Sequence, residues 1–194
     1  MKPPFLILAA NYPRFDQRET LYHQIGWSDV IDHPAFQDTC AIRMSLALVA
    51  SGFPLTGNMK VNAGRLKGRA IETAQARLSN TLKRAWGKPE VYRGELEARP
   101  AVANRSGVVS FFQIRGPAVR SGGHIDLVFP GAAGLSTCAR SCFFGAAEVW
   151  FWPLKCKLSL AAPYFGKACT VFTWRAAHSG YWCSSLLIQA CQTS

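Results

Sequence analysis

A cysteine and a histidine far apart in the chain are the residues best suited to chemistry. Cys40 lies in the segment DTCAIRMSLAL, and His124 lies in the segment SGGHIDL. A thiolate is a strong nucleophile, and an imidazole can take the proton from a thiol. A helix N-terminus and a nearby imidazole both lower the pKa of a thiol, which is otherwise mostly protonated at neutral pH. The pair therefore suggests a thiol hydrolase.

The sequence around Cys40 predicts a helix that begins at the cysteine. Strong helix formers and apolar residues at helical spacing follow it. Asp38 and Thr39, just before it, are residue types that cap helix N-termini. The sequence SGFP at residues 51–54 predicts that the helix ends near Ala50. Cys40 then lies in the first turn, although burial in the core is the common alternative for a free cysteine.

The sequence around His124 predicts two strands joined by a turn. Residues 107–114 have the composition of a buried strand, residues 115–123 of a glycine-rich turn, and residues 124–129 of a second, alternating strand. In that alternation His124 and Asp126 share one face of the strand. Such a face either lines a cleft or meets solvent, and the spacing alone leaves both open.

Several ordered segments resemble the type VI secretion amidase effectors, closest to family 4. They are the start of the chain at residues 2–5 and 11–13, the cysteine motif at 36–48, the histidine motif at 123–127, and closing segments at 138–144 and 148–154. Their order is more specific than any one motif. The resemblance implies an α+β fold with a papain-like cysteine peptidase core, in which the helix bearing the nucleophile packs on an antiparallel sheet.

The resemblance also implies a function. Effectors of this family are injected into rival Gram-negative bacteria and cut the peptide stem of peptidoglycan, for family 4 between γ-linked D-glutamate and meso-diaminopimelate. Cys40 would attack the amide carbonyl, His124 would act as general base, and the backbone amide of Cys40 would serve the oxyanion. A cognate immunity protein and the type VI secretion apparatus are the implied partners. No metal or organic cofactor is required.

The third catalytic position departs from the family pattern. The family has an aspartate between paired cysteines, where this chain has Arg140, and an arginine cannot accept the imidazole N–H. Ser136, Ser141, a backbone carbonyl or Asp126 could orient His124 instead. Asp126 has the right charge but lies only two residues along the same strand. We name Asp126 as the third candidate catalytic residue.

The chain is strongly basic, with a formal charge of +11 over 194 residues. Such a charge favours an anionic partner, either peptidoglycan carboxylates or nucleic acid. The basic residues between 65 and 88 are dispersed along a stretch predicted to be helical and to end near Trp86, and no nucleic-acid-binding motif accompanies them. We therefore predict a solvated helix face and no nucleic-acid partner.

Targeting signals are weak in this sequence. No apolar run reaches the roughly 20 residues of a membrane-spanning helix. The short apolar stretch behind Lys2 lacks the length and cleavage site of a signal peptide. With the family resemblance, this predicts a protein made in the cytoplasm, secreted without a cleaved signal and active in the periplasm of a target bacterium.

The cysteines and the composition divide the chain into two parts. Residues 1–154 correspond to the predicted amidase domain, and residues 155–194 form a C-terminal extension without acidic residues. Cys138 and Cys142 are close enough to form a disulfide in an oxidising periplasm. Two other functions remain open. A thiol acyltransferase or deamidase would keep Cys40 and His124, and a non-enzymatic basic binding domain would not depend on Cys40.

Overall fold

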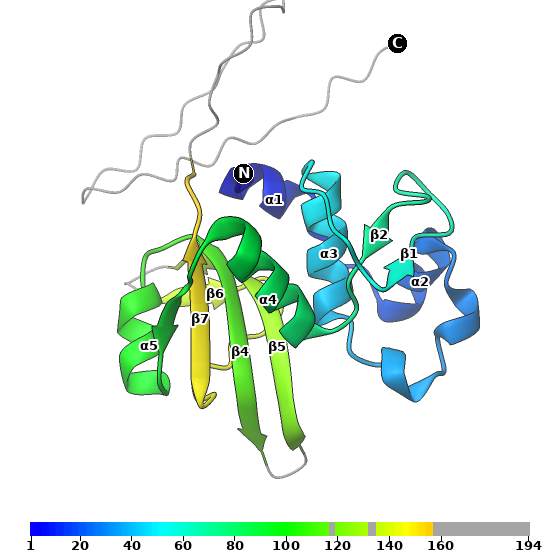
Figure 1. The fold of residues 1–194 in the computed structure, drawn as a ribbon. Helices are drawn as coiled ribbons and strands as arrows, with labels where there is room; N and C mark the ends of the chain where they lie inside the picture. Colours follow the sequence, from blue (N-terminus) through cyan, green and yellow to red (C-terminus); the bar gives the residue numbers. More distant parts are fainter. Residues whose placement is uncertain (117–118, 132–134, 157–194) are drawn as a thin grey trace, which may run out of the picture.

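The structure, a computed structural model, describes residues 1–116, 119–131 and 135–156 (Figure 1). The predicted C-terminal extension lies outside these ranges from residue 157 onward. The helices are α1 (Phe5–Ala10), α2 (Arg18–Ile25), η1 (Ser28–Val30), η2 (Pro34–Phe36), α3 (Cys40–Ala50), α4 (Gln75–Trp86) and α5 (Glu95–Val102). The strands are β1 (Met59–Lys60), β2 (Ala70–Ile71), β3 (Glu90–Tyr92), β4 (Gly107–Gly116), β5 (Val119–Pro130), β6 (Ser136–Cys138) and β7 (Glu148–Pro153).

An antiparallel sheet forms the centre of the described fold. Its strands follow the order β3-β7-β4-β5-β6, and each neighbouring pair is antiparallel. β4 is rich in valine and phenylalanine, which suits a central strand. Val109 of β4 lies opposite Asp126 of β5. Ile125 and Leu127 belong to one hydrophobic cluster, whereas Val109, the partner of Asp126, belongs to another. The predicted alternation is therefore confirmed, with His124 and Asp126 on one face of β5 and Ile125 and Leu127 on the other.

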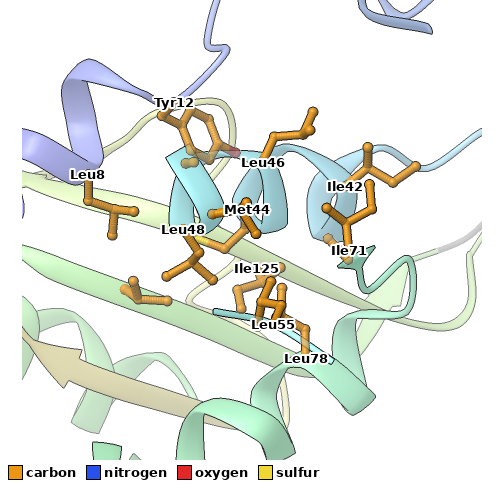
Figure 2. Close-up of a cluster of buried hydrophobic side chains, with 14 of the residues drawn as sticks. Leu8, Tyr12, Ile42, Met44, Leu46, Leu48, Leu55, Ile71, Leu78 and Ile125 are labelled. Carbon is orange, nitrogen blue, oxygen red and sulfur yellow. The ribbon is translucent and has the colours of Figure 1, made fainter. Parts of the chain in front are cut away.

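Helices cover both faces of this sheet. α3 and α4 pack against β5 on one face, and α5 lies against the opposite face (Figure 1). Figure 2 shows the buried cluster between the layers, in which Met44 and Leu48 of α3 lie near Ile125 of β5 and Leu78 of α4. The α+β fold class is confirmed, with the helix that carries Cys40 packed on an antiparallel sheet.

The cysteine helix has the predicted bounds. α3 begins at Cys40 and ends at Ala50, and all but its last residue are buried. Its end is closed by Gly52, whose φ of +83° lies in the left-handed region that favours glycine. The Gly52 amide donates to the Val49 carbonyl and the Phe53 amide donates to the Leu48 carbonyl, which satisfies two terminal carbonyls of the helix. The C-terminal end of α3 is therefore fixed by local contacts.

Two predictions of local structure are wrong. β4 continues to Gly116 and β5 begins at Val119, so most of the predicted turn at 115–123 is strand, because pairing with β4 holds the glycine-rich start of β5. The basic stretch is helical only over α4, from residue 75. Before α4, Gly64 and Gly68 have φ of +72° and +82° and form turns. The neighbouring basic residues, Arg65, Lys67 and Arg69, therefore lie outside the helix.

Membrane insertion can be assessed only for the described ranges. Within them, no helix is long and apolar enough to span a bilayer. The longest, α4, has 12 residues, whereas a spanning helix needs about 20.

Candidate active site

The structure brings the two predicted reactive groups together. Cys40 lies at the first position of α3, and His124 lies near the middle of β5. The Cys40 sulfur, a ring nitrogen of His124 and a carboxylate oxygen of Asp38 all lie within 4.8 Å of one another. The thiol is almost fully enclosed, with Cys40 only 4% exposed. A nucleophile and a base are thus neighbours at the junction of helix and sheet.

Asp38 is the residue in contact with Cys40 that sequence reasoning noted only as a capping type. One oxygen of its carboxylate, Oδ1, accepts a hydrogen bond from the backbone amide of Cys40 at 2.9 Å. The other, Oδ2, accepts from the Cys40 thiol at 3.4 Å. The amide that was predicted to serve an oxyanion therefore already has a carboxylate as its partner.

The protonation of Cys40 differs from the prediction. Burial, and then the negative charge of Asp38, raise the pKa of the Cys40 thiol well above its ordinary value. The expected lowering by the helix N-terminus and the imidazole is wrong for this arrangement, because desolvation and a like charge both disfavour the thiolate. The thiol therefore keeps its proton at neutral pH, and it can attack a carbonyl only if a base removes that proton.

His124 is held in place by a carboxylate and by aromatic rings. Its Nε2 atom lies 3.4 Å from Oδ2 of Asp126. Its ring stacks on Phe111 with an interplanar angle of 17°, and it meets Phe143 edge-on with centroids 5.1 Å apart. With Nε2 directed at Asp126, Nδ1 is the ring nitrogen left for the thiol of Cys40. This orientation is the one that a general base for Cys40 requires.

Asp126 is fully buried, and its carboxylate is held by backbone amides. The Leu127 amide donates to Oδ1 at 2.8 Å. The amides of Arg140 and Ser141 donate to Oδ2 at 2.8 and 3.0 Å. Such donors compensate for the burial of a carboxylate. The loop in which the family pattern places an aspartate thus supplies backbone donors to Asp126, and the guanidinium of Arg140 donates instead to the backbone carbonyl of Arg14.

The loop that carries these amides is closed by a disulfide. Cys138 and Cys142 are joined, with their Cα atoms 5.4 Å apart, which confirms the predicted pairing. Cys138 also ends β6, which pairs with β5 beside Val128. The disulfide and the pairing of β6 with β5 therefore together fix the position of these amides relative to Asp126. Ser136, another predicted orienter of His124, donates its hydroxyl to the Val102 carbonyl.

Tyr12 is a further residue of this region that sequence reasoning gave no role. It is buried, and burial followed by the charge of Asp126 raises the pKa of its hydroxyl. Tyr12 and Cys40 belong to the same buried hydrophobic cluster, which places this part of the N-terminal segment beside the site. The position of Tyr12 in the N-terminal segment that resembles the family was the only signal for it.

A pocket of about 390 Å³ lies beside the glycine-rich part of β5, and its lining includes neither Cys40 nor His124. Its lining includes Arg93, Glu148 and Gln75, and also Gly123, which directly precedes the histidine. Gln75 donates through Nε2 to Ser110 at 2.5 Å, and its Oε1 would lie 2.0 Å from a Cβ placed on Gly123. A side chain at position 123 would therefore require the Gln75 side chain to move. Among the described residues, no carboxylate forms an ion pair with Arg93.

The fold and the site together define the class: a papain-like α+β protein with a thiol and an imidazole side by side at the start of its central helix. The family model described as "Type VI secretion system (T6SS), amidase effector protein 4" matches residues 36–152. The chain belongs to this family, and it is therefore an amidase effector. No curated protein sequence matches it significantly.

Solved structures of Tae4 effectors show the same fold. The Tae4 effector from Enterobacter cloacae is 23% identical, with a TM-score of 0.64 over 80% of this chain and 98% of that one. The Tae4-Tai4 effector-immunity complex from Enterobacter cloacae gives 23% identity and a TM-score of 0.63, over 80% and 100%. The Tae4-Tai4 complex from Salmonella Typhimurium gives 22% and 0.62, over 79% and 99%.

Proposed function

We propose that this protein is an antibacterial cysteine amidase that cleaves the peptide stem of peptidoglycan. The proposed bond joins γ-linked D-glutamate to meso-diaminopimelate, and the proposed place of action is the periplasm of a target bacterium after type VI delivery. The observation that carries the proposal is the Cys40 thiol within 4.8 Å of a His124 ring nitrogen, in a chain of an amidase effector family. The catalytic residues in this proposal are Cys40, His124 and Asp126.

The first half of the reaction transfers a proton and forms a thioester. His124 takes the thiol proton at Nδ1 while the Cys40 sulfur attacks the amide carbonyl, because the raised pKa of the thiol leaves no preformed thiolate. The tetrahedral intermediate collapses, the C–N bond breaks, and the imidazolium returns the proton to the leaving amine. Water, activated by the same imidazole, then hydrolyses the thioester. Asp126 holds the ring and stabilises the imidazolium.

The oxyanion site requires a movement of Asp38. The Cys40 amide at the N-terminus of α3 is a suitable donor for the developing negative charge. Its present partner is Asp38 Oδ1, at 2.9 Å. The substrate carbonyl must therefore displace this carboxylate. Asp38 is exposed and precedes the helix, so its side chain can rotate into solvent.

The pocket lined by Gly122 and Gly123, the two residues before His124 in β5, is the proposed place for the stem peptide. Arg93 and Glu148 give it one cationic and one anionic wall. A diaminopimelate residue carries both a carboxylate and an ammonium group, which such a pair can recognise separately. Glu148 accepts from the Trp150 indole N–H at 2.5 Å, so its carboxylate is held in a defined position.

The remaining parts of the proposal concern partners and domain organisation. The solved Tae4-Tai4 complexes are effector-immunity complexes, which supports a cognate immunity protein for this chain. The family match over residues 36–152 supports an amidase domain that ends near residue 154. Deleting residues 155–194 and measuring solubility and activity tests whether the extension is dispensable.

Digestion of purified peptidoglycan tests the function. Wild type should release stem fragments that gain one water at the γ-D-glutamyl bond, as read by mass spectrometry. Cys40→Ala and His124→Ala should abolish release, and Asp126→Asn should lower kcat by roughly 10²-fold. The matched control is His23→Ala, an exposed histidine of α2.

The products also separate the alternatives. Transfer of the stem to an added amine would indicate an acyltransferase, and loss of ammonia without chain cleavage would indicate a deamidase. Full activity in Cys40→Ala, or none in wild type, would refute the cysteine amidase. Unchanged turnover in Asp126→Asn would remove Asp126 from the catalytic residues.

A further inference from the structure

Three different metal-binding side chains converge at the N-terminus of α3. They are the carboxylate of Asp38, the thiol of Cys40 and the imidazole of His124, with one donor atom of each within 4.8 Å of the others. We propose that this cluster is an inhibitory binding site for Zn²⁺. Mixed oxygen, sulfur and nitrogen donors favour zinc, whereas Mg²⁺ and Ca²⁺ prefer oxygen alone. Within the described ranges, no second group of this kind occurs.

The spacing of the donors is close to that of a tetrahedral zinc site. Zinc binds sulfur at about 2.3 Å and carboxylate oxygen at about 2.1 Å, so two such ligands at a tetrahedral angle lie roughly 3.6 Å apart. The Cys40 sulfur and Asp38 Oδ2 are 3.4 Å apart. The His124 nitrogen, at no more than 4.8 Å from either atom, reaches the same spacing with a movement of about 1 Å. The fourth position is left to water.

The surroundings of His124 are those of a metal-bound histidine. Metal-binding histidines commonly direct their second nitrogen at a carboxylate, which fixes the ring and its tautomer. Nε2 of His124 lies 3.4 Å from Asp126, and Asp126 is itself held by three backbone amides. Nδ1 is thereby left as the ligand atom. The donors come from α3, the segment before it and β5, so the fold places them together before any ion binds.

Zinc at this site blocks the groups needed for hydrolysis. As the zinc–sulfur bond forms, the thiol proton of Cys40 leaves to solvent, and the lone pair of His124 Nδ1 is occupied by the metal. No base remains for a thiol and no free sulfur remains for a carbonyl. This inhibitory consequence rests on the proposed function, but binding of the ion does not. A chelator should restore the metal-free protein.

Cobalt absorption tests the binding without substrate. Co²⁺ takes zinc sites, and its bond to a thiolate gives a charge-transfer band in the near ultraviolet. The full chain should bind one equivalent with a band that is absent from Cys40→Ala, and added Zn²⁺ should displace it. The difference spectrum between wild type and Cys40→Ala isolates this site from the other cysteines. Circular dichroism of each variant verifies its fold.

Asp38→Asn tests the third ligand. Loss of the carboxylate should weaken Co²⁺ affinity at least tenfold, and the Zn²⁺ concentration for half inhibition, relative to each variant's own activity, should rise equally. Asp32→Asn, an equal charge change at an exposed position, should match wild type. Absence of the band from wild type, or equal affinity in Asp38→Asn, would overturn the three-ligand site. An inactive metal-free enzyme would refute the amidase and leave the cobalt result intact.

Discussion

Asp38→Asn should make the Cys40 thiol more reactive. The substitution keeps the shape of the side chain and removes the negative charge that lies 3.4 Å from the sulfur. Because Asp38 is exposed, the water limit of Coulomb's law applies, which gives about 1.2 kcal/mol, or about 0.9 pKa unit. Burial, the larger cause of the raised pKa of Cys40, stays unchanged. The pKa should therefore fall by about one unit and still lie above its ordinary value.

The rate of alkylation by iodoacetamide measures this change. A pKa lower by about 0.9 unit raises the thiolate fraction roughly eightfold at any pH below both values, and the weaker nucleophilicity of the less basic thiolate reduces the gain to about threefold. Cys40→Ala identifies the background from the other cysteines. Asp32→Asn, with the same charge change on the surface, should react at the wild-type rate. An unchanged or slower rate in Asp38→Asn would show that the carboxylate does not act on the thiol.

Three further predictions follow from the site. Arg93→Gln should raise KM for stem peptide about tenfold with kcat nearly unchanged. Arg69→Gln, at an exposed position, should change neither constant. Equal kinetics in both variants would show that the pocket does not bind the stem peptide. Replacing Cys138 and Cys142 by serine should lower the free energy of unfolding by about 2 kcal/mol and reduce kcat, and denaturant titration that shows no loss would contradict this. Because folding raises the pKa of Cys40, the protonated thiol stabilises the folded state fully below the ordinary thiol value of 9.0, and this stabilisation declines as the pH rises above that value. The decline should be smaller in Cys40→Ser, as thermal melts at pH 8 and about pH 10 would show.

The elements that position the site could be predicted because their signals are local. The bounds of α3 follow from helix formers between Cys40 and a glycine stop, and the shared face of His124 and Asp126 follows from the period of a strand. The partners of these residues could not be predicted in the same way. Backbone amides hold Asp126 from a loop 14 and 15 residues away, and a backbone amide has no sequence signature.

The protonation state of Cys40 could not be predicted from the local sequence either. Its neighbours in sequence, a capping aspartate and a helix, are compatible with a lowered or a raised pKa. Burial under the sheet and the rotamer of Asp38 decide between the two, and both arise from tertiary packing. The extra strand length around residues 115–123 likewise comes from pairing with β4, which overrides the turn tendency of glycine and serine.

The small ring closed by Cys138 and Cys142 gives the site a sensitivity to its redox environment. The ring holds the amides of Arg140 and Ser141 on Asp126, and Asp126 in turn faces the His124 ring. A reductant that breaks the disulfide therefore alters the position of the His124 ring indirectly, because two backbone donors to the buried Asp126 carboxylate become less firmly held. Bacterial cytoplasm is reducing and the periplasm is oxidising. The geometry of the imidazole is thereby coupled to the compartment in which the chain resides.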